Sequence, residues 1–164
     1  MYRLENKSLA AEFDGQGRLT YLSGTERNVI ASPAEASFRM VFRKDGNWEN
    51  VIYGSGQDFA VTQSQSELRF HAPVLCCWNG TSVNISLTLV ACLEEDSLRF
   101  RAEICNQEEG ALVTDFEYPY VGMVKSLDGG TPALLFPGQC GSRITNIGEY
   151  LARRESREQH SCAY

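Results

Sequence analysis

The sequence predicts an all-β protein built as an antiparallel β-sandwich. Apolar and polar residues alternate with a period of two in many segments of strand length, which is typical of half-buried strands. Clusters of glycine, asparagine and aspartate separate these segments as turns. Because almost no segment has the 3.6-residue period of an amphipathic helix, we expect about ten short strands in packed sheets.

Five stretches outside the middle of the chain carry this alternation in a simple form. Each places its apolar residues on one face, so each is expected to form a strand with one buried side. Their apolar residues are Leu9, Ala11 and Phe13; Leu19 and Tyr21; Phe38, Met40 and Phe42; Phe59 and Val61; and Leu112, Phe116 and Tyr118. The turns expected between and after them are Asp14–Gly17, Lys44–Asn47, Gly54–Gly56 and Asp128–Gly130.

The middle of the chain predicts a three-stranded meander from about Ser66 to Gln107. Val83–Leu93 and Leu98–Ile104 both alternate, and a two-residue turn at Glu95–Asp96 would join them. This turn places apolar residues opposite one another on the same face, which fixes the register. The expected pairs are Leu93 with Leu98, Ala91 with Phe100, Leu89 with Ala102 and Leu87 with Ile104.

The first strand of the meander is expected to follow from a tight turn at Asn79–Gly80, because both residues tolerate positive φ. This turn would place Trp78 opposite Thr81. Pro73 cannot donate a hydrogen bond to a ladder, so we expect an edge position or a bulge there. Continuing the register, the expected apolar pairs are Cys76 with Val83, Val74 with Ile85, Phe70 with Leu89 and Leu68 with Ala91.

Only the tail of the chain has helix-forming composition. Asn146–Gln159 is expected to form a short C-terminal helix, with Glu149 as a partner for a cap at Asn146. No linker, low-complexity tract or internal repeat divides the 164 residues. Residues 1–164 are therefore expected to form a single β-sandwich domain.

The six cysteines are expected to be free thiols packed as small hydrophobic residues. They form no C-x-x-C pair, and Cys76 and Cys77 point to opposite faces of any strand, so no metal site is predicted. The register above keeps Cys92 and Cys105 apart, which excludes a disulfide between them. Free thiols are typical of a reducing compartment.

Composition and charge exclude several classes of partner. The 15 lysines and arginines against 21 aspartates and glutamates give a net charge of −6, which argues against binding to nucleic acid phosphates. Polar residues interrupt the longest uncharged run, Phe70–Leu93, so no membrane span is predicted. Gly54–Gly56 lacks the Lys-Ser/Thr of a phosphate-binding loop, and no cofactor is predicted. Met1–Asp14 has no signal-peptide core, which together with free thiols predicts a cytoplasmic protein.

Three motifs occur in a fixed order along the chain. The opening LENKSLAAEFDGQGRLTYL combines a strand, a D-x-x-G turn and a G-x-L-x-x-L strand. DSLRFRAEICNQ follows the pattern D-x-L-x-F-x-x-x-I-x-N, and ALLFPG ends a strand in a Pro-Gly turn. From about Tyr2 to Gly138, these motifs resemble the galactose mutarotase-like supersandwich found at the N-terminus of many glycoside hydrolases.

The resemblance implies a domain that packs on a C-terminal catalytic (β/α)8 barrel of the same parent protein. Domains of this group are usually longer than this chain, so the chain is expected to be an N-terminal fragment. Active mutarotases use a pair of histidines and a glutamate base, and this sequence has no match for that set.

Sugar recognition requires flat apolar faces that stack on the C–H groups of a pyranose ring and a few polar side chains that bind its hydroxyls. Arg39 and Arg43 lie on the polar side of a predicted strand and are candidates to bind hydroxyls or a partner domain. The aromatic candidates for carbohydrate binding are Trp48, Tyr53, Trp78, Tyr118 and Tyr120.

No residue is assigned a catalytic role, but three are weak candidates. Glycoside hydrolysis needs two carboxyl groups about 5–5.5 Å apart for retention or about 6.5–9.5 Å apart for inversion. Asp115 and Glu117 lie two apart on a predicted strand, so they share a face at roughly 7 Å. His71 is expected on an outward polar face opposite Thr88.

The sequence thus predicts a non-catalytic N-terminal domain of a glycoside hydrolase that packs on the catalytic domain and contacts carbohydrate. One alternative is an enzyme, either a mutarotase-like aldose epimerase or a small glycosidase, with Asp115, Glu117 or His71 as acid and base. Another is a structural domain that binds proteins through exposed aromatic residues. Because a truncated sandwich leaves strand edges uncovered, a homo-oligomer formed through such edges is also expected.

Overall fold

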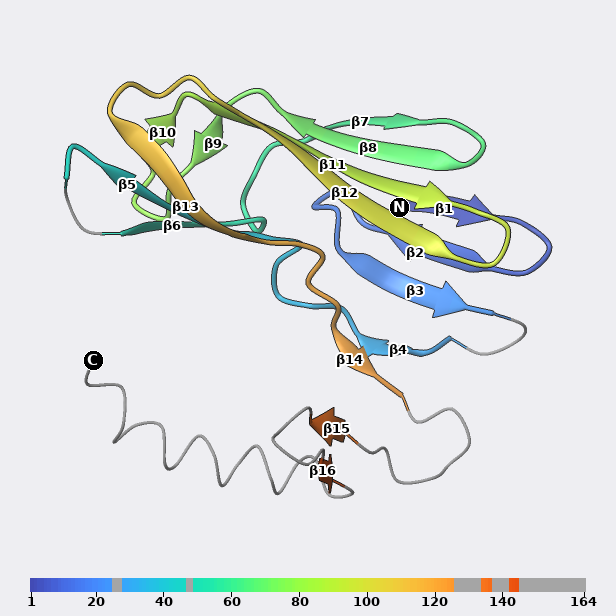
Figure 1. Ribbon diagram of the computed structural model, residues 1–164. Coiled ribbons are helices and arrows are strands. Elements are labelled where there is room, and N and C mark those ends of the chain that lie inside the picture. Colours follow the sequence, from blue (N-terminus) through green and yellow to red (C-terminus); the bar gives the residue numbers. More distant parts are fainter. Residues whose placement is uncertain (25–27, 47–48, 126–133, 137–141, 145–164) are drawn as a thin grey trace. The chain divides into compact units, whose positions relative to one another are not determined.

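The computed structural model describes residues 1–24, 28–46, 49–125, 134–136 and 142–144. Contacts divide the chain into two units, Met1–Lys125 and Ser126–Tyr164. Every secondary-structure element in these described ranges is a β-strand, and all paired strands run antiparallel (Figure 1). The predicted all-β class with antiparallel sheets is confirmed.

The strands are short, and most are separated by turns of a few residues. In the first unit they are β1 (Tyr2–Glu5), β2 (Ala10–Phe13), β3 (Leu19–Ser23), β4 (Ile30–Ser32), β5 (Arg39–Lys44), β6 (Asn50–Tyr53), β7 (Ala60–Gln63), β8 (Glu67–Ala72), β9 (Leu75–Cys76), β10 (Ser82–Val83), β11 (Ile85–Leu93), β12 (Leu98–Asn106), β13 (Ala111–Glu117) and β14 (Met123–Val124). The second unit contains the hairpin of β15 (Leu134–Phe136) and β16 (Ser142–Ile144).

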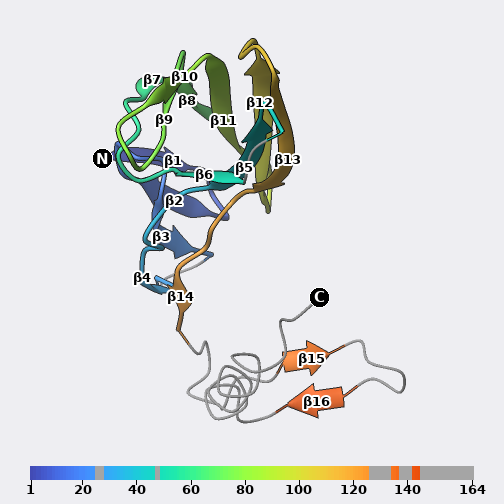
Figure 2. The ribbon, with the colours of Figure 1, turned by 90° about the vertical axis from the view of Figure 1, so that its left-hand side faces the viewer.

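The first unit is built from three sheets and two short strand pairs. One sheet has the strand order β12-β11-β8-β7, a second has the order β13-β5-β6, and a third has the order β1-β2-β3. The short pairs are β9 with β10 and β4 with β14. Figure 2 shows the three sheets arranged around a common interior, as in a sandwich.

Aromatic rings link the three sheets through the core. The ring of Phe70 on β8 lies 6.0 Å from Phe13 on β2 and 6.2 Å from Phe59, centroid to centroid. The ring of Phe38 lies 6.5 Å from Phe59 and 5.7 Å from Phe116 on β13. A continuous chain of ring contacts, worth more than the buried area alone, therefore ties strands of three different sheets together.

The predicted register of the β11–β12 hairpin is confirmed. Leu93 pairs with Leu98 and Ala91 with Phe100, as the two-residue turn requires. Leu89 pairs with both Ala102 on β12 and Phe70 on β8, so three strands contribute apolar residues to one row. The predicted meander is therefore present, with β7 added at the outer side of β8.

The predicted pairs Cys76–Val83 and Trp78–Thr81 are wrong by one residue, and Val74, predicted to pair with Ile85, lies outside both ladders. Cys76 pairs with Ser82, because Gly80 adopts φ 82° and the hairpin closes over three residues. The amide of Cys77 donates to the carbonyl of Thr81 at 2.8 Å, which closes this longer loop. A three-residue loop with a left-handed residue is the next most common hairpin after the two-residue one.

Breaks in both strands absorb this shift, so the pairs further along are still correct. Pro73 lies after the end of β8 and outside both ladders, as its missing N–H requires. Asn84 separates β10 from β11, and its amide donates to a carboxylate oxygen of Glu108 at 2.6 Å. Phe70 with Leu89 and Leu68 with Ala91 therefore pair as predicted.

Several predictions fall outside the described residues, namely the helix over Asn146–Gln159, the turn at Asp128–Gly130, and the state of Cys140 and Cys162. The single-domain organisation stays a prediction. The four cysteines in the described part of the chain are free thiols. No helix of the described residues has the length and apolar character needed to cross a membrane.

Replacing Phe70 tests the core. Phe70 is 1% exposed and contacts rings from other strands, so Phe70→Ala is expected to lower the free energy of unfolding by about 3–5 kcal/mol. Chemical denaturation measures this change. Thr62→Ala on the exposed side of β7 is the control and should stay within about 0.5 kcal/mol of the parent. A loss below about 1 kcal/mol for Phe70→Ala would contradict the described core.

Candidate functional site

Three strands place polar side chains in one row on the outer face of the β13-β5-β6 sheet. Arg39 on β5 pairs with Tyr53 on β6 and with Glu117 on β13. The next residue along β5, Met40, pairs with Phe116, and both pack in the core. Because side chains alternate along a strand, Arg39 and Glu117 must point outward.

Arg39 binds two carboxylates at once. Its Nη1 lies 3.1 Å from Oδ2 of Asp115 and 3.3 Å from Oε1 of Glu117, so the two acidic residues share a face as predicted. Desolvation works against the charged guanidinium, but the charge of Glu117 and the hydrogen bond to Asp115 prevail, and the pKa of Arg39 lies above its usual value. The acidic side chains are 52% and 43% exposed, so the cluster is open to a ligand.

Tyr120 extends this cluster. Its hydroxyl donates a short hydrogen bond to Oε2 of Glu117, and its backbone amide donates to the carbonyl of Ser37 at 3.0 Å. The hydrogen bond to the Glu117 carboxylate, followed by desolvation and the negative charge, raises the pKa of Tyr120 to about 12. Tyr120 is therefore held as a neutral phenol that orients one carboxylate.

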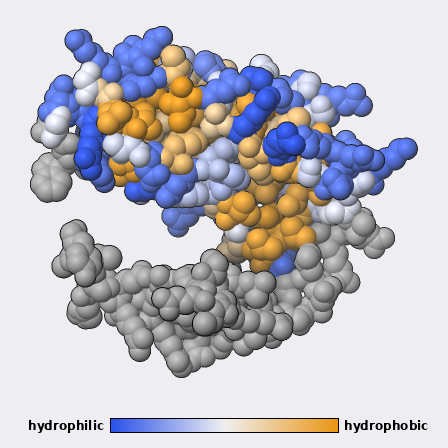
Figure 3. Space-filling model, viewed as in Figure 1, coloured by the Kyte–Doolittle hydropathy of each residue, from blue (hydrophilic) through white to orange (hydrophobic). Residues whose placement is uncertain are grey.

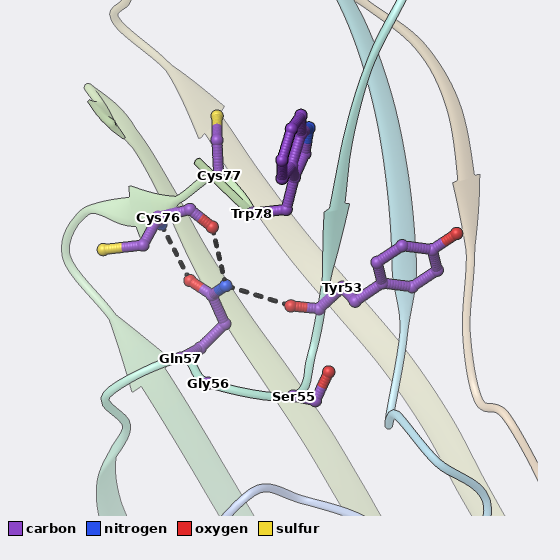
Figure 4. A pocket seen from close by; sticks show the side chains of 7 residues that line it. All are labelled: Tyr53, Ser55, Gly56, Gln57, Cys76, Cys77 and Trp78. Atoms are coloured by element: carbon purple, nitrogen blue, oxygen red, sulfur yellow. Dashed lines mark hydrogen bonds between the residues drawn. The ribbon is translucent and has the colours of Figure 1, made fainter. Parts of the chain in front are cut away.

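A pocket of about 250 Å³ opens on the other side of Tyr53 (Figure 4). The segment that follows β6 supplies one wall, and the β9–β10 hairpin supplies the other. Trp78 at the hairpin turn is 84% exposed and Tyr53 is 44% exposed, so the pocket has two accessible aromatic side chains. Its lining residues are Tyr53, Ser55, Gly56, Gln57, Cys76, Cys77 and Trp78.

Gln57 holds the two walls together. Its Nε2 donates to the carbonyl of Tyr53 and to the carbonyl of Cys76, each at 2.9 Å, and its Oε1 accepts from the amide of Cys76 at 2.9 Å. Figure 4 shows these three bonds. The side chain is 4% exposed and its polar atoms are paired, as buried polar groups require. Gln57 thus has a structural role, and the other residues that line the pocket are the ones available to bind a ligand.

Gly54 sets the direction in which the chain leaves β6. Its amide donates to the carbonyl of Phe38 at 2.9 Å, which brings the backbone against the segment before β5. A Cβ at this position would lie 2.9 Å from the backbone nitrogen of Ser37, closer than real side chains approach. Only glycine therefore allows the chain to pass here and to place Tyr53 beside the pocket.

The structure does not bring the remaining sequence candidates to this pocket. Tyr118 packs in the core, with its ring 5.7 Å from Phe100, and burial raises the pKa of its phenol. Arg43 lies further along β5 and pairs with Glu49 at 2.8 Å. Trp48 lies outside the described residues.

His71 lies away from the two acidic candidates. It is on β8 in the four-stranded sheet, where its Nδ1 lies 3.0 Å from Oγ1 of Thr88, the residue predicted to face it. Asp115 and Glu117 are on β13 in another sheet, and no hydrogen bond or ion pair within the described residues connects them to His71. The three weak catalytic candidates thus do not form one group.

Sequence patterns do not single out Ser55 or Gln57, although both line the pocket. The usable signal is the short Gly54–Gly56 loop between two predicted strands, because loops on a rigid scaffold often carry binding residues. Nothing in the sequence shows that this loop meets the hairpin around Trp78.

No protein-family model and no curated protein matches the chain. In the described residues, no group of three histidine, cysteine, aspartate or glutamate side chains could hold a metal ion. The site therefore has to be interpreted from its aromatic side chains, its arginine and its carboxylates.

The hydrogen bond between Tyr120 and Glu117 is testable by titration. Because the pKa in the folded protein lies above the ordinary value of 10, the bond contributes fully to stability below about pH 10 and is lost as the pH rises towards 12. An ultraviolet titration of the parent protein, with Tyr120→Phe as the difference standard, should show this phenol ionising near pH 12.

Glu117→Gln removes the carboxylate and should return the pKa of Tyr120 towards 10, whereas Arg43→Gln, four residues from Arg39 on the same strand, should leave it unchanged. A Tyr120 pKa that stays near 12 in Glu117→Gln would show that the hydrogen bond is not its cause.

Proposed function

We propose that the first unit is a non-catalytic, carbohydrate-contacting β-sandwich domain of a glycoside hydrolase-like protein. The observation that carries the proposal is the pocket lined by Tyr53 and Trp78, two exposed aromatic residues, with Tyr53 paired to Arg39 of the charged row. Residues distant in sequence supply this combination, which suits a ligand with both apolar and hydroxyl-bearing faces.

The aromatic side chains supply the apolar part of the site. A pyranose ring presents C–H groups on one face, and tyrosine or tryptophan rings offer a flat apolar surface with a polar tip. The backbone of Tyr53 is held by its pairing with Arg39 and by the bond from Gln57. The backbone of Tyr53 is therefore already ordered and costs no further conformational entropy on binding.

The charged row supplies groups that can bind hydroxyls. Arg39 pairs with Tyr53 in the sheet and offers guanidinium donors. Asp115 and Glu117, on the strand beyond Arg39, offer carboxylate acceptors. Ser55 adds a hydroxyl inside the pocket. Because the carboxylates are about half exposed, a sugar hydroxyl can reach them without breaking the fold.

The same geometry favours binding over catalysis. Hydrolysis requires one carboxylic acid that gives up a proton and one carboxylate that acts as base or nucleophile. Here both carboxylates bind the same guanidinium, and Glu117 also accepts the hydroxyl of Tyr120. Neither is placed alone in an apolar pocket, the setting that turns a carboxyl group into a general acid.

The wider context of the proposal rests on the sequence resemblance to N-terminal supersandwich domains. The strands that carry the first two motifs, β1–β3 and β12, are strands of the sheets that enclose the core. In this proposal the domain packs on a catalytic domain and helps to hold its substrate.

Binding is tested by calorimetric titration of the protein with a panel of mono- and oligosaccharides. Trp78→Ala and Tyr53→Ala should each weaken the affinity about tenfold or more, since exposed aromatic anchors often dominate binding energy. Leu112→Ala, which removes a side chain 65% exposed at the far end of β13, should have no effect. Absence of heat with every sugar, or equal affinities for all variants, would contradict the proposed site.

A polarimetric assay distinguishes this proposal from the epimerase alternative. Freshly dissolved glucose or galactose should mutarotate at the same rate with and without the protein, and Glu117→Gln should change nothing. A protein-dependent rate that Glu117→Gln abolishes would overturn the non-catalytic assignment.

A further inference from the structure

One edge of the four-stranded sheet is long and regular. β12 has nine residues and pairs with β11 on one side, while no strand of the described residues pairs with its other side. The ladder with β11 has no register shift, and β12 contains no proline, glycine or lysine. By contrast, β7 at the opposite edge has four residues, and β13 has a register shift between Val113 and Asp115. Shortness and bulges protect edges from pairing, and β12 has neither.

The hydrogen bonds at the two ends of the β11–β12 ladder show which backbone groups of β12 are open. The amide of Glu94 donates to the carbonyl of Ser97, and the amide of Gln107 donates to the carbonyl of Asn84, each at 2.9 Å. Bonded residues alternate along an antiparallel strand, so odd-numbered residues of β12 bond to β11. The even-numbered residues direct their N–H and C=O groups to the open side; they are Leu98, Phe100, Ala102, Ile104 and Asn106.

We propose that β12 pairs antiparallel with β12 of a second copy of this chain, around a twofold axis at Ala102. In this register Phe100 of each copy lies opposite Ile104 of the other, and Arg101 lies opposite Glu103. Both apolar residues are even-numbered, so their free backbone groups form the new ladder. The two four-stranded sheets become one continuous sheet of eight strands.

Charge selects this register over its neighbours. A twofold axis at Arg101 or at Glu103 would place identical charges opposite each other, and an axis at Phe100 would place Arg99 opposite Arg101. The axis at Ala102 instead gives two opposite-charge pairs and no like-charge pair. Directly opposed opposite charges stabilise a sheet, and like charges destabilise it.

The charged side chains are accessible for these pairs. Arg101 is 52% exposed and binds Glu67 at 2.9 Å, while Glu103 is 59% exposed and lies 3.8 Å from Arg69. Across the axis, each Arg101–Glu67 pair would join the Glu103–Arg69 pair of the other copy. The contact therefore extends ion pairs that already exist and buries no isolated charge.

This edge also leaves an apolar side chain partly exposed to solvent. Ile104 lies on the inner side of β12, with Leu87 opposite it on β11, but is 38% exposed. Figure 3 shows apolar residues on the face of the unit over β12 and β13. In the proposed dimer the edge of Phe100 from the second copy covers Ile104, and the small side chain of Ala102 allows close approach at the axis.

The test is the oligomeric state of the parent chain by sedimentation velocity over a range of concentrations. A concentration-dependent dimer is expected. Arg101→Glu and Glu103→Arg each convert both opposite-charge pairs into like-charge pairs, so each should raise the dimer dissociation constant about tenfold or more. The double variant Arg101→Glu/Glu103→Arg restores opposite charges and should regain most of the affinity.

Two controls separate a lost interface from a lost fold. Arg43→Glu reverses a charge on the other sheet and should leave the dimer unchanged. Hydrogen exchange read by NMR should show the amides of Phe100, Ala102 and Ile104 gaining protection as concentration rises, while thermal unfolding shows that each variant is folded. A chain that stays monomeric, a dimer indifferent to the single reversals, or a double variant no tighter than the single variants would overturn the proposal.

Discussion

The register of β8, β11 and β12 is the constraint on which the rest of the structure depends. Side chains alternate with a period of two, so a slip of one residue would move every apolar residue to the solvent face. Phe70, Leu89 and Ala102 stand in one cross-strand row, and Phe70 begins the ring contacts that reach the other sheets. The same alternation decides which amides of β12 bond to β11 and which face outward. Core packing and the open edge are thus two results of one register.

The central meander could be predicted because local and non-local signals agree there. At the β11–β12 turn, the two-residue loop and the matching of apolar residues such as Leu93 and Leu98 select the same register. At the β9–β10 turn, loop length and the matching of apolar residues do not select a single register. Asn79–Gly80 suits a two-residue or a three-residue loop, and the short strands beyond it carry too few buried side chains to decide. The error stayed local because Pro73 and Asn84 interrupt the strands.

For the site, the sequence shows which residues face outward but not which strands lie next to one another. Alternation was enough to place Arg39, Asp115 and Glu117 on polar faces. Their meeting depends on β5 pairing with β13 across 76 residues of sequence, and no local signal predicts that partner. The role of Gln57 is even harder to predict from the sequence. A buried glutamine whose side chain bonds only to backbone groups has the same sequence signature as an ordinary loop residue.

The proposed pocket and the proposed edge contact use different parts of the first unit, so either can exist without the other. The pocket depends on side chains after β6 and on the β9–β10 hairpin, whereas the edge contact depends on backbone groups of β12. A dimer through β12 would carry two Tyr53–Trp78 pockets, one on each copy, at a fixed spacing. Two weak sites held at a fixed spacing bind a polymer with repeating units far more tightly than one site does, provided that the spacing allows both to engage. A pocket of only about 250 Å³ gains most from such pairing, because its single-site affinity is limited by its small contact area.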